Sequence, residues 1–84
     1  MIGLEVKLKV GSTGIGKIIG CIPKGHIPAS YVIEKYYGLS ETDRDYKSVH
    51  RATKSNRWII EKDNGHYLIV PDSKIGVDVE FVEN

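Results

Sequence analysis

Residues 57–70 read RWIIEKDNGHYLIV and contain the strongest local signal in the chain. Two runs rich in β-branched and aromatic side chains, which favour strands, flank the turn sequence Asp63-Asn64-Gly65. The pattern predicts a β-hairpin over residues 57–70. We expect Trp58 in the core, because an indole buries a large apolar area that a small domain needs.

A basic segment directly precedes this hairpin. Four cationic side chains recur at intervals of three, four and three residues: Arg44, Lys47, Arg51 and Lys54. In a helix they would cover an arc of about 80°, at about 100° per residue, with Tyr46, Val49 and Ala52 on the opposite side. The spacing predicts a helix over residues 43–54 with an apolar inner face and a cationic outer face.

Two further helices are expected before this one. Residues 12–22 carry isoleucines at helical spacing: Ile15, Ile18, Ile19 and Ile22. Gly16 and Gly20 weaken that helix by roughly 1 kcal/mol each relative to alanine, so it needs support from tertiary packing. Residues 28–37 show the same apolar spacing and end at Gly38, a residue typical of helix C-termini.

The two ends of the chain resemble strands. Residues 4–10 and 75–82 alternate apolar and polar side chains with period two. They could pair within one sheet or across a homodimer, because exposed strand edges attract partners. The predicted fold class is α+β, a winged helix-turn-helix of three short helices and a β-hairpin wing with N- and C-terminal strands. It forms a single domain over residues 1–84.

Charge is unevenly distributed along the chain. The net charge is +1, but residues 43–57 carry five basic and two acidic side chains, whereas residues 71–84 carry one basic and four acidic. This asymmetry predicts one cationic surface. The single cysteine, Cys21, cannot form an intramolecular disulfide, and no apolar run approaches the roughly 18 residues of a membrane span. We therefore expect a cytoplasmic protein without membrane contact.

Motifs for phosphate, metal or catalysis are weak. Residues 11–18 (GSTGIGKI) match the phosphate-loop pattern G-x-x-x-x-G-K, but Ile18 replaces the magnesium-binding hydroxyl. We interpret the stretch as a glycine-rich strand-to-helix turn, whose amides could alternatively hold a DNA phosphate. The histidines lack the paired spacing of a zinc site: His26, His50 and His66. We expect no metal, no cofactor and no enzymatic activity.

Three stretches resemble one known family. Residues 22–33 (IPKGHIPASYVI) are similar to the start of the DNA-binding domain of the alkylguanine-DNA alkyltransferases and alkyltransferase-like proteins. Residues 47–52 (KSVHRA) resemble the recognition helix of that family, Arg-Ala-Val-x-x-Ala, and residues 59–65 resemble the stretch that follows its active site. The resemblance implies a winged-helix fold and DNA as the partner.

The same resemblance implies roles for two side chains. Tyr31 would contact the DNA backbone, and Lys47 would enter the base stack in place of a flipped nucleotide. The acceptor motif Pro-Cys-His-Arg is missing, since the chain has Asn56-Arg57-Trp58 there, and Cys21 lies too early in the chain to replace it. Alkyl transfer is therefore not expected.

These observations predict a small, non-catalytic DNA-binding protein of the transcription-regulator kind. It would bind double-stranded DNA with a recognition helix at residues 43–54 and a wing at residues 57–70. The expected contact residues are Lys24, Tyr31, Arg44, Lys47, His50, Arg51, Lys54, Arg57, Lys62 and Asn64. Two alternatives remain open, a protein-interaction module or inhibitor on the same scaffold, and an alkyltransferase-like damage sensor that flips a base without reacting.

Overall fold

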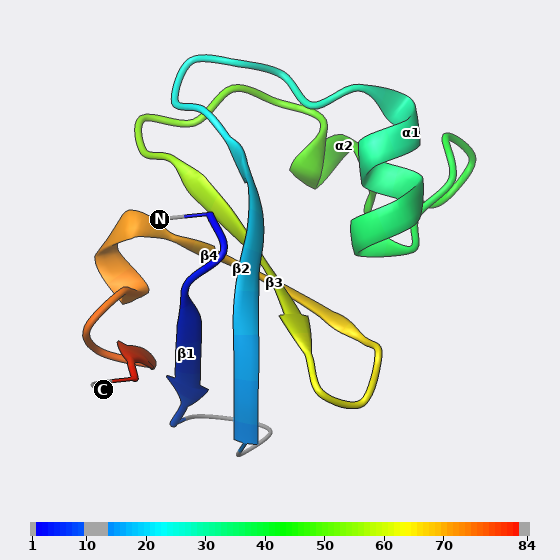
Figure 1. Ribbon diagram of the computed structural model, residues 1–84. Coiled ribbons are helices and arrows are strands. Elements are labelled where there is room, and N and C mark those ends of the chain that lie inside the picture. The colour runs from blue at the N-terminus through cyan, green and yellow to red at the C-terminus, as the bar shows by residue number, and fades with distance from the viewer. Residues whose placement is uncertain (1, 10–13, 83–84) are drawn as a thin grey trace.

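A curled antiparallel sheet forms the body of the protein (Figure 1). The computed structural model describes residues 2–9 and 14–82, and five strands lie in that part of the chain. They are β1 (Glu5–Leu8), β2 (Gly14–Ile22), β3 (Arg57–Lys62), β4 (Tyr67–Pro71) and β5 (Val79–Phe81). Their order across the sheet is β4-β3-β2-β1-β5, so β5 returns to pair with β1 after a 3-10 turn at Asp72–Lys74.

The sheet has an inner face, which the curl encloses, and an outer face. The inner face carries the main core, which consists of Val6, Leu8, Ile18, Ile60, Val70 and Val79. Trp58, Leu68 and Ile75 pack against this cluster. Since successive side chains of a strand point to opposite faces, Arg57 and Ile59 lie on the outer face while Trp58 and Ile60 lie on the inner face.

The strand β2 is the longest and changes its facing halfway along. A β-bulge between Ile18 and Gly20 places an extra residue against β3, so that Ile18 pairs with Ile60 but Gly20 pairs with Ile59. Even-numbered residues of β2 therefore face the inner side of the sheet before the bulge and the outer side after it. Ile18 is buried on the inner face, and Ile22 is buried on the outer face.

This bulge explains why the helix expected over residues 12–22 is wrong. Residues 14–22 form a strand in which Ile18 and Ile22 are both buried, on opposite faces, because of the bulge, whereas Ile15 is 43% exposed. Gly16, which should weaken a helix, is buried, and a Cβ at this position would lie only 2.7 Å from Ile60 Cγ2 on β3. We expected the amides at the start of this helix to be able to hold a phosphate, but residues 14–22 form a strand and not a helix. Residues 11–13 lie outside the described part of the chain.

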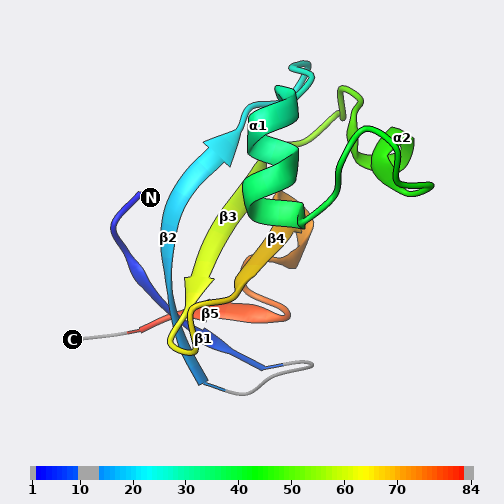
Figure 2. The same ribbon diagram turned by 90° about the vertical axis from the view of Figure 1, so that its right-hand side faces the viewer.

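Between β2 and β3 the chain leaves the sheet for residues 23–56, which we call the insert. It contains α1 (Ser30–Val32), which continues as a π-helical turn at Ile33–Tyr37, and one helical turn, α2 (Tyr46–Val49). Figure 2 shows this helical segment in front of the sheet, and Tyr36 of the π-helical turn contacts Tyr67 of β4 edge to face, with ring centroids 4.9 Å apart. The insert covers the upper part of the outer face, where Ile22, Ile33 and Ile59 are buried.

The winged helix-turn-helix prediction is wrong, because the protein is mainly an antiparallel sheet with short helices. The expected helix over residues 43–54 shrinks to α2. It ends at His50 (φ −81°, ψ 66°), where the backbone turns, and Arg51 N–H bonds to Val49 O at 2.9 Å. The stripe of four basic residues therefore does not form one helical face.

Other expectations for single elements are confirmed. The hairpin over residues 57–70 is present as β3 and β4, and Gly65 takes a positive φ of 86° in its turn. Helical structure runs from Ser30 to Tyr37 and ends at Gly38, whose left-handed φ is 70°. The N- and C-terminal strands pair with each other in one sheet, although β5 is shorter than expected. No helix within the described ranges is long and apolar enough to cross a membrane.

Candidate functional site

The first residue of β3 joins the sheet to the insert. Arg57 is 7% exposed and lies on the outer face beneath the insert. Its guanidinium donates hydrogen bonds to three backbone carbonyls, those of His26 (3.2 Å), Val49 (3.1 Å) and Arg51 (2.7 Å). These carbonyls belong to separate parts of the insert, so one side chain holds its beginning and its end against the sheet.

The charge of Arg57 has no anionic partner among the described residues. The ion pairs Lys9–Glu80 and Lys74–Asp78 do not involve this guanidinium. Its Nε is buried and makes no hydrogen bond within the described chain. Burying a cation without a carboxylate is costly, and the three carbonyl acceptors offset that cost only in part. A positive charge therefore remains under the surface at this point.

The two ends of the insert are bonded together beside Arg57. Gly25 N–H donates to Thr53 O at 2.9 Å, and Lys24 N–H donates to Asn56 Oδ1 at 2.9 Å. The backbone N–H of Asn56 donates to Asp72 Oδ2 at 3.2 Å. These bonds hold residues 51–56 in an irregular but defined path along the sheet.

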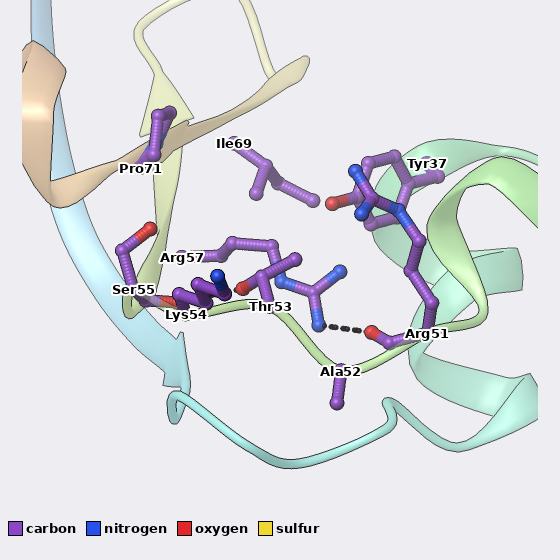
Figure 3. A pocket seen from close by; sticks show the side chains of 9 residues that line it. All are labelled: Tyr37, Arg51, Ala52, Thr53, Lys54, Ser55, Arg57, Ile69 and Pro71. Atoms are coloured by element: carbon purple, nitrogen blue, oxygen red, sulfur yellow. Dashed lines mark hydrogen bonds between the residues drawn. The ribbon is translucent and has the colours of Figure 1, made fainter.

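A cleft of about 540 Å³ opens above Arg57, between residues 51–55 and the outer face of β4 (Figure 3). Its lining residues fall into three groups of three. The basic ones are Arg51, Lys54 and Arg57; those with a hydroxyl are Tyr37, Thr53 and Ser55; the apolar ones are Ala52, Ile69 and Pro71. None of these nine described side chains is acidic, so the cleft is electropositive.

Figure 3 shows how these side chains are arranged. Arg57 extends across the middle of the cleft, and Ile69 lies above it, with Pro71 to one side. Arg51 and Tyr37 stand together at the other end. Arg51 Nε donates to Ser48 O at 2.8 Å, which fixes the base of that guanidinium while the residue stays exposed. The cleft can therefore offer guanidinium and ammonium donors to an anion.

Three of the ten expected contact residues meet in this cleft: Arg51, Lys54 and Arg57. Lys24 lies next to it on the bonded loop, whereas Lys62 and Asn64 lie at the far end of β3, roughly 16 Å along the strand. The other four are spread over the surface of the insert: Tyr31 on α1, Arg44 before α2, Lys47 on α2, and His50, whose ring stacks on Tyr46 at 5.1 Å.

Sequence reasoning missed the other six lining residues, Tyr37, Ala52, Thr53, Ser55, Ile69 and Pro71. The sequence did contain a signal for two of them, Ile69 and Pro71. Residues 68–71 (LIVP) form a continuous apolar run, which is typical of a strand buried on both faces and so predicts a covered outer face. Nothing in the sequence places Tyr37 beside them, because that contact depends on how the insert folds back.

Features for catalysis or metal binding are weak elsewhere. Cys21 is half-buried in β2 opposite Trp58, and burial, followed by the nearby charge of Asp72, raises the pKa of its thiol. A protonated thiol is a poor nucleophile. Across residues 2–9 and 14–82, no group of three or more His, Cys, Asp or Glu side chains is placed to hold a metal ion.

Comparison with protein-family models, curated proteins and solved structures finds no match for this chain. The resemblance to the alkyltransferase family therefore stays a prediction. The segment that it assigns to the recognition helix, residues 47–52, includes three of the four residues of α2, followed by an irregular stretch.

Proposed function

We propose that this protein is a non-catalytic DNA-binding protein that holds the phosphate backbone at the electropositive cleft. The observation that carries the proposal is the buried charge of Arg57, which has no carboxylate partner in the described chain and lies between the exposed cations Arg51 and Lys54. A phosphate placed there would offset this charge. We place the activity in the cytoplasm, where a lone cysteine stays reduced.

The proposed mode of binding differs from the one expected from the sequence. Because residues 43–54 do not form one continuous helix, this segment offers no recognition helix that could enter the major groove. Contacts to phosphate position a protein on DNA but carry no sequence information directly. We therefore propose binding that depends on charge and is largely independent of base sequence, with an affinity that falls steeply as salt rises.

The test compares two double variants that remove the same number of charges. R51Q/K54Q removes the two exposed cations of the cleft, and K7Q/K17Q removes two from the outer face of β1 and β2. Binding to random-sequence duplex DNA is measured by fluorescence anisotropy at several salt concentrations. We expect R51Q/K54Q to lower affinity at least tenfold and to reduce the slope of log K against log salt by about 2. Equal losses in both variants would contradict the cleft as the binding site.

A protein partner is the second candidate. It is favoured by two exposed apolar side chains on the insert, Ile27 (58% exposed) and Tyr31 (75% exposed), which line a separate groove beside the end of β2. A stoichiometric complex that survives nuclease treatment and is lost in I27S/Y31S, while R51Q/K54Q retains it, would support this role over DNA binding.

A further inference from the structure

We infer that the cleft accepts one unstacked nucleotide, so that the protein binds single-stranded DNA in preference to duplex DNA. This inference rests on the proposed function and narrows it. It follows from the shape of the cleft and from the fact that its walls are of two chemical kinds.

The first wall is cationic and belongs to the end of the insert. Arg51 and Lys54 are exposed on it, and the buried charge of Arg57 lies at the base of the cleft. This wall suits a phosphate, because guanidinium and ammonium groups donate charge-assisted hydrogen bonds to its oxygens.

The second wall is apolar and belongs to the outer face of β4. Ile69 and Pro71 are half-buried there, at the edge of the area that the insert covers, and Tyr37 closes the end of the cleft beside Arg51. A phosphate alone would leave this wall in contact with water. A nucleotide would use both walls, with its phosphate on the cations and its base against Ile69, Pro71 and Tyr37.

The size of the cleft favours a single unstacked unit. Its volume of about 540 Å³ lies within the range of sites that enclose a small molecule, about 300–1,000 Å³. A duplex keeps its bases stacked and paired inside, so it presents only sugar and phosphate to a concave surface. Single strands expose base faces, and proteins that bind them combine a cationic groove with aromatic and apolar contacts to those faces.

The experiment measures the affinity of the full chain for a short oligothymidine and for a duplex of the same length at one salt concentration. We expect the single strand to bind at least tenfold tighter. I69T removes an apolar contact from the cleft while keeping a β-branched residue in the strand. I15T makes the same change at an exposed position of the outer face, far from the cleft.

The expected result is that I69T lowers affinity for the single strand fivefold or more, that I15T leaves it unchanged, and that neither variant alters duplex binding. Thermal unfolding of both variants identifies a loss caused by misfolding; if I69T does not fold, Y37L replaces it with the same expected effect. Amide chemical shifts on adding oligothymidine should change at residues 51–55 and 67–71.

Two results would overturn the inference in distinguishable ways. If the duplex binds as tightly as the single strand and R51Q/K54Q weakens both, DNA binding at the cleft stands and the preference for single strands is wrong. If neither nucleic acid binds at low salt, the proposed function itself fails, and the preference fails with it.

Discussion

The two halves of the outer face use the same strands in opposite ways. In the covered half, Ile22, Arg57 and Ile59 lie under the insert and are buried. In the open half, Ile15, Lys17 and Glu61 lie in water on the same two strands, beyond the bulge. The comparison shows that the bulge in β2 sets the boundary, because it lets one strand bury side chains on the inner face before it and on the outer face after it.

The halves also differ in how their cations are compensated. In the open half, Lys17 faces Glu5 on one neighbouring strand and Glu61 on the other, and Lys9 bonds to Glu80 at 2.9 Å. In the covered half, Arg57 has carbonyl acceptors but no carboxylate within the described residues. Cations of the open half thus have acidic residues opposite them in the sheet, whereas Arg57, under the insert, bonds only to neutral carbonyls within the described residues.

The largest expected effect comes from exchanging one cation in each half for methionine. R57M removes donors from three partly buried carbonyls, so we expect it to lower the free energy of unfolding by about 3 kcal/mol. K17M, on the open half, should change it by no more than about 0.5 kcal/mol. Urea denaturation measures both. Equal losses would show that Arg57 does not hold the insert.

A smaller effect is expected from two glycines of β2 that lie on either side of the bulge. A Cβ on Gly16 would lie 2.7 Å from Ile60 Cγ2 and 3.1 Å from Glu61 O, whereas a Cβ on Gly20 would make an ordinary 3.5 Å contact with Ile59 Cδ1. G16A should therefore destabilise the protein by about 1–3 kcal/mol, while G20A should be nearly neutral. The thermal midpoints of the two variants test this, and the reverse order would contradict the assigned register.

The smallest effect concerns acid stability of the open half. The hydrogen bond from Lys9, followed by the charge of Lys9, lowers the pKa of Glu80 below its usual 4.5. The ionised carboxylate therefore stabilises the folded protein above that pH, and its contribution disappears as the pH falls through the lowered pKa. E80Q should be slightly less stable than the wild type near neutral pH and should converge with it in acid. A difference in stability between the two proteins that does not shrink as the pH falls below 4.5 would contradict the shift.

Local signals were sufficient where neighbours in sequence decide the structure. The turn at Gly65 and the helix end at Gly38 were both predicted, because each depends on one glycine and a few flanking residues. The strand structure of residues 14–22 was not predicted. Its isoleucine spacing fits a helix as well as a bulged strand, and only the pairing with β1 and β3 decides between them. The helix over residues 43–54 failed for a similar reason, since the Val49 and Arg51 carbonyls bond to Arg57 from another element.

The candidate site was predictable in its charges and not in its shape. Arg51 and Lys54 were expected on one helical face with Arg44 and Lys47, and Arg57 was expected on the wing. The structure brings only Arg51, Lys54 and Arg57 together in one cleft. The apolar wall depends on β4 lying beside the end of the insert, a contact between residues distant in sequence. Recognising residues 68–71 as buried on both faces would have indicated that some element covers them, but not which one.

The way the insert joins the sheet determines how easily it could be lengthened or replaced. Ile22 and Arg57 are directly paired in the ladder, so the chain departs and returns between two adjacent positions. Lengthening a connection of this kind is thermodynamically mild, about 0.6 kcal/mol for each doubling. The insert and the sheet are in this sense separable. A descendant or a designed variant could exchange the whole excursion for another, provided that it again shields Ile22 and Ile59, and so acquire a new ligand on an unaltered frame.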